Sequence, residues 1–210
     1  MNNGAKRTEI DLLRHGEHVL GDVICGVTDP KLSEAGWAQL HNQCARLVQQ
    51  GAQWDVCITS PRQRCADFAE HLSQRLAIEY VVDDGFAEVD FGRWEGRSYR
   101  EIANTYPGQW QAWLAQPTKP APHGGDRYAE FLQRIHQSWI ALINRRQGKR
   151  ILLVIHGGVT RAIFASVFDL APGTLFRFRV PHACHSRIIA YHQANAADWF
   201  QLDSHNSSSA

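Results

Sequence analysis

The sequence lacks several features that would point directly to a function. Its 22 Lys and Arg residues barely exceed its 21 Asp and Glu residues, which gives a formal net charge of +1. Without a basic excess there is no electrostatic case for general binding to nucleic acid or to an anionic membrane. No apolar run is long enough to span a bilayer, and the polar opening MNNGAKRTEI contains no secretory signal. We therefore expect a cytoplasmic protein that binds neither nucleic acid nor membrane.

Common metal and nucleotide motifs are also missing. The five cysteines are scattered and form no CxxC pair, which predicts reduced thiols rather than disulfides. The stretch from Pro181 to His185 contains two histidines and a cysteine, but no partner pair elsewhere completes a zinc site. Neither a P-loop nor a GxGxxG turn is present, and there is no HExxH helix. We expect no metal and no cofactor.

Short apolar runs alternate with longer amphipathic stretches along the chain. The runs are nearly continuous in apolar residues, as is typical of strands that are buried on both faces of a parallel sheet. The expected strands cover residues 10–13, 56–59, 78–82 and 151–155. Helical spacing is found in residues 33–50, from Pro61 onward, and in residues 128–146. This order predicts an α/β fold, a three-layer α/β/α sandwich with a mostly parallel central sheet.

The length of 210 residues is typical of one domain. We assign residues 1–203 to a single domain. Residues 84–126 interrupt the alternation with many glycines, prolines and tryptophans, so we expect a helical excursion over one end of the sheet. The small polar residues 204–210 predict a disordered tail.

Reactive side chains follow three of the expected strands. Arg14-His15-Gly16-Glu17 follows the first, Ser60-Pro61-Arg62-Gln63-Arg64 the second, and His156-Gly157-Gly158 the last. The carboxyl ends of parallel strands meet at one edge of a sheet, where α/β proteins bind ligands. Guanidinium groups and helix N-termini are well suited to phosphate oxygens. The sequence thus predicts a phosphoryl site, in which a neutral histidine could attack phosphorus.

Four motifs carry a resemblance to a known family. They are Leu13-Arg14-His15-Gly16-Glu17, Ser60-Pro61-x-x-Arg64, the Glu88 to Gly96 stretch (ExDFGxWEG), and Ile155-His156-Gly157-Gly158. In their order and spacing they resemble the histidine phosphatase (phosphoglycerate mutase-like) superfamily, over about residues 8–192. The Gly26 to Ser33 loop, Gly36-Trp37 and Phe91 to Ser98 are most similar to alpha-ribazole-5'-phosphate phosphatases of cobalamin nucleotide-loop assembly.

The resemblance implies a phosphoglycerate mutase-like fold and a role for each motif. His15 would be the nucleophile that forms a phosphohistidine, with Arg14, Arg64 and His156 holding the phosphate oxygens. Glu88 would protonate the leaving group and then activate water, for which burial would have to raise its pKa. His156 is counted with His15 and Glu88 as catalytic. Asp90, Glu95 and Glu101 are weaker candidates for the acid.

Other residues near these motifs have open roles. The superfamily often has a phosphate-binding Asn shortly after RHGE, and this sequence has none there, so His18 or a backbone amide would replace it. His182 and Trp110 are further possible substrate contacts, although Trp110 also fits a core-facing helical stripe. We interpret Arg62 as an exposed residue at a helix start. Arg161 is interpreted as a member of a structural ion pair.

The expected function is a metal-independent phosphomonoesterase, with alpha-ribazole 5'-phosphate as the favoured small-molecule substrate. A broad-specificity sugar-phosphate phosphatase is the nearest alternative. The sequence lacks the long insertions of phosphoglycerate mutases, so a mutase is a weaker alternative. A non-catalytic phosphate-binding scaffold would not need Glu88 beside the phosphate. A homodimer remains possible.

Overall fold

The computed structural model describes residues 6–119, 121–194 and 196–207. Its centre is a six-stranded sheet in the order β3-β2-β4-β1-β5-β6. The strands are β1 (Arg7–Arg14), β2 (Val56–Thr59), β3 (Glu79–Val82), β4 (Arg150–Ile155), β5 (His185–Tyr191) and β6 (Trp199–His205). The first four are parallel, whereas β5 and β6 are antiparallel to their neighbours. The prediction of a mostly parallel central sheet is confirmed.

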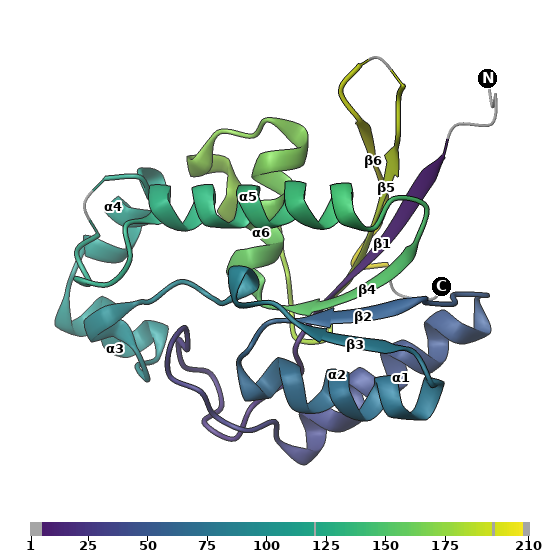
Figure 1. Ribbon diagram of the computed structural model, residues 1–210. Helices are drawn as coiled ribbons and strands as arrows, with labels where there is room; N and C mark the ends of the chain where they lie inside the picture. Colours follow the sequence, from purple (N-terminus) through teal and green to yellow (C-terminus); the bar gives the residue numbers. More distant parts are fainter. Residues whose placement is uncertain (1–5, 120, 195, 208–210) are drawn as a thin grey trace.

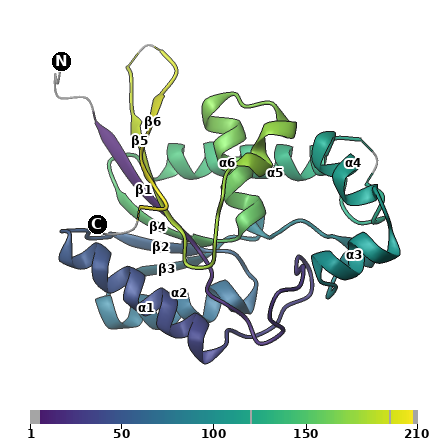
Figure 2. The same cartoon turned by 180° about the vertical axis from the view of Figure 1, so that it is seen from behind.

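Helices cover both faces of this sheet (Figures 1 and 2). One face carries α1 (Glu34–Gln49) and α2 (Gln63–Leu76), and the other carries α5 (Tyr128–Arg145) and α6 (Gly157–Phe168). The central strand β4 shows how both faces are filled. Leu152 and Val154 pack with the apolar stripes of α1 and α2, whereas Ile151, Leu153 and Ile155 pack with those of α5 and α6. Because side chains alternate along a strand, one apolar run supplies both layers.

The segment between β3 and α5 lies at the end of the sheet where the parallel strands finish. It contains the 3₁₀ turns η1 (Asp84–Phe86) and η2 (Gly92–Trp94), followed by the short helices α3 (Tyr99–Thr105) and α4 (Gln109–Ala115). Ser98 and Glu101 form a capping box that starts α3. A third 3₁₀ turn, η3 (Pro172–Arg177), follows α6 and contacts α4. These pieces enclose the space beyond the sheet edge.

Two boundaries differ from the sequence predictions. Ser204 and His205 are not disordered, because they end β6, where Ser186 and His205 share a side-chain hydrogen bond of 2.8 Å. Residues 208–210 lie outside the described part of the chain. The second helix begins at Gln63 instead of Pro61, since Arg62 has the extended backbone of an N-cap residue. All five cysteines are free thiols, and four of them are buried.

No helix within residues 6–119, 121–194 and 196–207 combines the length and the apolar character that a bilayer crossing requires.

Candidate active site

The first and last reactive motifs meet at the carboxyl edge of the sheet. β1 and β4 are adjacent and parallel, so His15 and His156 leave the sheet side by side, and their ring centroids are 5.3 Å apart. The amide of His15 also donates to the carbonyl of Ile155 at 2.9 Å. Ser60, which follows β2, lies 2.7 Å from Nε2 of His156 through its hydroxyl. The predicted convergence of three strand ends is confirmed.

His15 is held in the form that a nucleophile needs. Its Nδ1 lies 2.8 Å from the carbonyl oxygen of Gly16, which can only accept a hydrogen bond, so Nδ1 carries the proton. The lone pair is then on Nε2. Burial lowers the pKa of His15 well below 6.5, and the charges of Arg14 and Arg64 lower it further. The imidazole is therefore neutral near pH 7, with Nε2 free to attack.

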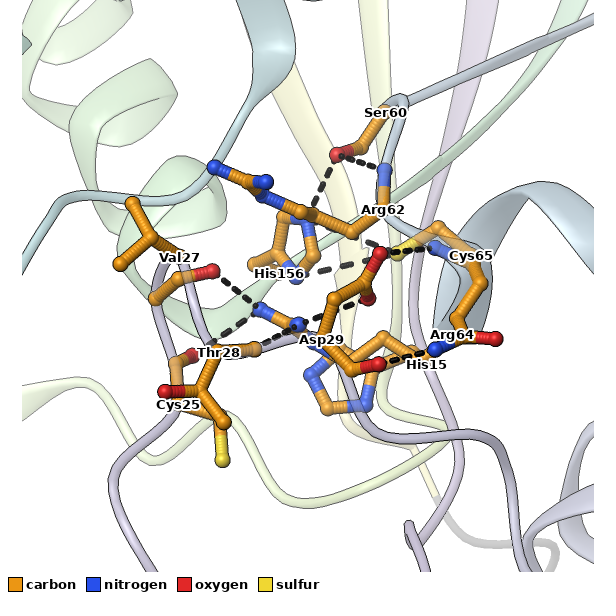
Figure 3. A network of polar contacts seen from close by, with 12 residues as sticks. His15, Cys25, Val27, Thr28, Asp29, Ser60, Arg62, Arg64, Cys65 and His156 are labelled. Atoms are coloured by element: carbon orange, nitrogen blue, oxygen red, sulfur yellow. Dashed lines mark hydrogen bonds and ion pairs between the residues drawn. The ribbon is translucent and has the colours of Figure 1, made fainter. Parts of the chain in front are cut away.

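Arg64 is fully buried and tied to the loop of residues 25–29, here called the Arg64 loop (Figure 3). Its two terminal nitrogens donate to the carbonyls of Cys25, Gly26 and Thr28 at 2.9–3.0 Å, and to the Asp29 carboxylate at 3.3 Å. Only Nε has no partner among the described residues. Arg64 thus keeps one N–H group without a partner and a positive charge fixed in place, whereas its bidentate fork is occupied by the loop.

Arg14 approaches the site from the end of β1. Its Nη1 donates to the carbonyl of Val180 at 2.6 Å, and its Nε is buried without a partner in the described chain. Burial and the nearby charge of Arg161 lower the pKa of Arg14, though its guanidinium remains charged at any ordinary pH. The two arginines make the site strongly cationic, as a phosphate dianion requires.

Glu88 reaches the site from the segment that follows η1. It is 7% exposed, and its carboxylate accepts hydrogen bonds from the amides of Gly158 at 2.8 Å and Val89 at 3.1 Å. Burial raises the pKa of Glu88 despite these hydrogen bonds and the charges of Arg64 and Arg14, which lower it. A buried carboxyl group with a raised pKa is suited to holding a proton for transfer.

The two glycines after His156 make this arrangement possible. A Cβ atom on Gly158 would lie 2.3 Å from Oε1 of Glu88. A Cβ on Gly157 would lie 3.2 Å from Nη1 of Arg161 and 3.5 Å from Nε of Arg14. The start of α6 can therefore approach the carboxylate and the guanidinium groups closely only because side chains are absent there.

A cavity of about 280 Å³ opens beside Arg14, His15 and Glu88. Most of its remaining wall is apolar or aromatic, and it comes from residues 23–25, the excursion, α5 and η3. The aromatic lining residues are Phe91, Tyr99, Trp110, Trp113, Tyr128 and Phe176. Glu88 is the only acidic side chain among the residues that line the cavity. The space therefore combines a cationic end at the nucleophile with an apolar, aromatic chamber beyond it.

The three possible substrate contacts lie at different places. His18 is buried, lines the cavity, and has its ring 6.1 Å from that of His15. Trp110 lines the cavity, and its ring centroid lies 5.4 Å from that of Trp113, which is the buried residue of the two. His182 lies 5.5 Å from His15, yet it lines a neighbouring hollow instead of this cavity. In the described chain no three His, Cys, Asp or Glu side chains are grouped to hold a metal ion.

Two predictions about single residues near the site are wrong. Arg161 forms no ion pair with any described residue; its Nε and Nη1 donate to the carbonyls of Phe178 and Gly157, both at 3.1 Å. It also lines the cavity. Arg62 stands at a helix start, as predicted, since it is the N-cap residue of α2; it is partly buried instead of exposed, and Figure 3 shows it beside His156. Its Nε is buried without a partner among the described residues.

Glu95, one of the weaker candidates for the acid, has a role near the site that the sequence did not predict. The carboxylate of Glu95 accepts hydrogen bonds from the amides of Gly26, Val27 and Thr28, at 2.9–3.1 Å. It also accepts from the amide of Phe91 at 3.0 Å. Glu95 therefore holds the same loop whose carbonyl groups hold Arg64.

Comparison with known proteins agrees with this geometry. The histidine phosphatase superfamily (branch 1) matches residues 10–202. A bifunctional protein of Mycobacterium tuberculosis strain H37Rv is 32% identical over 197 residues, which are 93% of this chain and 53% of that protein. The chain thus spans about half the length of that relative. The adenosylcobalamin/alpha-ribazole phosphatase of Escherichia coli K12 is 25% identical over 179 residues, 84% of this chain and 87% of that protein.

Solved structures have the same architecture. A mycobacterial glucosyl-3-phosphoglycerate phosphatase in complex with VO3 matches with a TM-score of 0.84 and 26% sequence identity. The match covers 97% of this chain and the whole of the other. The family match spans most of the chain, and it includes all the motifs that meet at the sheet edge. The chain belongs to the histidine phosphatase superfamily.

Proposed function

We propose that this protein hydrolyses phosphomonoesters through a phosphohistidine on His15. The observation that carries the proposal is the placement of His15, with Nε2 free, and the buried acid Glu88 on one small cavity next to Arg14. A binding protein would need the cations but not a buried carboxyl group with a raised pKa. These residues supply a nucleophile, an acid and charge stabilisation, the three elements of a two-step phosphoryl transfer.

In the first step the Nε2 lone pair of His15 attacks phosphorus and the bond from phosphorus to the ester oxygen breaks. Glu88 gives its proton to the departing oxygen, so that the leaving group is an alcohol. Arg14, Arg64 and His156 stabilise the charge on the remaining phosphoryl oxygens. In the second step Glu88 takes a proton from water, whose oxygen attacks phosphorus, and the phosphorus–nitrogen bond breaks. Inorganic phosphate leaves, and both residues return to their initial forms.

Rapid chemical quench with p-nitrophenyl [³²P]phosphate in excess EDTA tests the mechanism. p-Nitrophenolate leaves without help from an acid, so Glu88→Gln should still form the phosphoenzyme but hydrolyse it slowly. We expect acid-labile, base-stable label to accumulate on Glu88→Gln and to be absent from His15→Asn. Label on His15→Asn, or full turnover by that variant, would exclude His15 as the nucleophile.

We propose alpha-ribazole 5'-phosphate as the substrate. The motifs most similar to alpha-ribazole-5'-phosphate phosphatases support it, as does the name of the E. coli relative. The aromatic chamber with Trp110 on its wall suits a flat base, since stacking on an aromatic ring stabilises such a group. We expect kcat/KM for this ester to exceed that for simple sugar phosphates by several hundredfold.

A broad-specificity sugar-phosphate phosphatase is the second candidate, favoured by the likeness to the mycobacterial glucosyl-3-phosphoglycerate phosphatase. Values of kcat/KM across alpha-ribazole 5'-phosphate, ribose 5-phosphate, 3-phosphoglycerate and p-nitrophenyl phosphate separate the two. Comparable values across this panel would keep the histidine mechanism and exclude the specific substrate. Trp110→Ala should raise KM for the ribazole ester more than for ribose 5-phosphate if the base stacks there.

A further inference from the structure

Arg161 is a cation on the cavity wall that the two-step reaction does not use. It lies in the first turns of α6, and its guanidinium reaches back to the helix start, where Nη1 donates to Gly157. Its Nε donates to Phe178, in the segment that follows η3. Two carbonyls from different elements thus fix the plane of the guanidinium, while three of its five N–H groups have no partner among the described residues.

The electrostatic surroundings of Arg161 are unfavourable for a structural arginine. The N-terminus of a helix is positive, and Arg14 adds a second guanidinium beside Gly157, where a Cβ atom would lie 3.2 Å from Nη1 of Arg161 and 3.5 Å from Nε of Arg14. No carboxylate in the described chain lies within ion-pair distance of Arg161. A half-buried cation next to another cation is costly unless something with negative charge or lone pairs binds there.

Arg161 lies between Arg14 and the aromatic side of the cavity. Its guanidinium carbon is 5.9 Å from the centre of the Phe176 ring, and that ring packs 5.0 Å from Trp113. Tyr99 and Trp110 line the same chamber. The phosphoryl group must contact His15 at the other end, so the part of an ester that extends into this chamber is its leaving group.

We propose that Arg161 is a specificity-determining residue that binds an oxygen acceptor on the leaving group, a hydroxyl or a carboxylate. The inference rests on the proposed function and extends it. An arginine can only donate hydrogen bonds, so it selects alcohols whose carbon skeleton carries a further oxygen over purely hydrocarbon ones. The ribose of a nucleoside 5'-phosphate and the carboxylate of a phosphorylated hydroxy acid both meet this requirement.

The test compares three esters with wild-type protein and Arg161→Met, which keeps a long apolar stem without the donors. Ribose 5-phosphate carries hydroxyl acceptors, 3-phosphoglycerate carries a carboxylate, and phenyl phosphate carries neither. We expect the ratio of kcat/KM for an oxygen-bearing ester to that for phenyl phosphate to fall tenfold to a hundredfold, the range typical of a charged hydrogen bond. Whichever of the two ratios falls more identifies the acceptor.

The exposed Arg145, in the last turn of α5, provides the matched control, and Arg145→Met should keep both ratios at the wild-type value. Competitive inhibition by inorganic phosphate distinguishes the two ends of the cavity. If the phosphate inhibition constant of Arg161→Met rises as much as the ester ratios fall, Arg161 binds the phosphoryl group and the inference is wrong.

Failure of the inference can be told apart from failure of the proposed function. Wild-type turnover that requires His15, combined with unchanged ratios in Arg161→Met, overturns only the role of Arg161. If the wild-type protein releases no phosphate from any of the three esters or from alpha-ribazole 5'-phosphate, both proposals are overturned.

Discussion

At the scale of single residues, the pairing of His15 with Glu88 sets opposite requirements on protonation. The free enzyme needs a neutral His15, whose pKa is lowered by burial, and a protonated Glu88, whose pKa is raised by burial. Activity should therefore fall at low pH as His15 gains a proton, and at higher pH as Glu88 loses one. Burial moves both values in the direction that widens the range in which the two forms coexist.

Replacing Glu88 by Gln tests whether Glu88 is the general acid, because esters with basic leaving groups should lose more activity than esters with weakly basic ones. An alkoxide is strongly basic and needs a proton, so kcat/KM for ribose 5-phosphate should fall about 10³-fold, within the usual range for a general acid. kcat/KM for p-nitrophenyl phosphate should fall far less, and its decline at high pH should disappear. Equal losses for the two esters would show that Glu88 does not protonate the leaving group.

Gly158 offers a second test of the same carboxylate. In Gly158→Ala the new Cβ would lie 2.3 Å from Oε1 of Glu88, so the carboxylate must move. We expect kcat for alkyl esters to fall at least tenfold. In a Glu88→Gln background the same substitution should cost much less, because the two changes affect one interaction. Additive losses in this double-mutant cycle would mean that Gly158 acts through the helix backbone.

At the scale of elements, the Arg64 loop is held by three residues. The Glu95 carboxylate accepts hydrogen bonds from amides of the loop, and carbonyls of the loop accept hydrogen bonds from Arg64. Gln63 donates to Asp29, at the end of the loop, through its amide and its side chain. The loop has no regular secondary structure, so these hydrogen bonds stabilise its shape. The position of Arg64 therefore depends in part on a carboxylate that lies in a different motif.

Glu95→Gln should weaken the binding of vanadate or inorganic phosphate about tenfold, because a neutral amide accepts fewer and weaker hydrogen bonds from the loop. Binding can be followed by competitive inhibition of p-nitrophenyl phosphate hydrolysis. Glu101→Gln is the control. Glu101 has an exposed carboxylate that belongs to the capping box of α3 and does not contact the loop, so this variant weakens the capping box alone. If both variants lose phosphate affinity equally, the effect reflects stability alone.

The elements that the sequence predicted best were those with strong apolar patterns. The bounds of β4 and α5 agree with the predicted ranges to within one residue at each end. A strand buried on both faces has a continuous apolar run, and a helix buried on one face has an apolar stripe, so both leave a clear pattern in the sequence. β6 was missed because its residues, WFQLDSH, are partly or fully exposed and pair along only one edge, with β5. The hydrogen bonds that order such an edge strand come from a distant partner, which local composition does not reveal.

The site residues that could be predicted are likewise those that follow strands with a strong apolar pattern. Arg14, His15 and His156 could be placed together because parallel strands must bring their carboxyl ends to one edge. The actions of Glu95 and Arg161 were not predictable in this way, since they depend on backbone amides and carbonyls of loops whose paths are set by tertiary packing. A turn residue and a helix residue each acquire a role only once those loops are in place.

At the scale of the whole molecule, two groups of buried titratable residues couple folding to pH in different ranges. Asp11, in β1, accepts hydrogen bonds from Trp54, His185 and Arg187. Burial raises the pKa of Asp11, but the hydrogen bonds from His185 and Arg187 outweigh it, so the net pKa is below 3.8. The stability that this network contributes is present above about pH 4 and is lost only as the pH falls through that lowered value.

The imidazole cluster around the nucleophile acts in a higher range. Burial lowers the pKa values of His15, His18, His156 and His182, for His182 to about 4. In the unfolded chain these groups bind protons near pH 6.5, whereas the folded chain resists doing so. Stability should therefore decrease as the pH falls from 7 toward 5, before the carboxylates titrate.

Thermal unfolding followed by circular dichroism at pH 7.5 and pH 5 checks this expectation. We expect a lower Tm at pH 5, and a smaller decrease in His182→Gln, because that variant no longer has an imidazole that must stay neutral in the fold. His136 is exposed on α5 and lies outside this cluster, so His136→Gln should retain the wild-type decrease. A Tm that is constant between the two pH values, or that rises at pH 5, would mean that the cluster accepts protons in the folded state. His15 would then be protonated too, and it could act as a nucleophile only if substrate binding caused it to lose that proton.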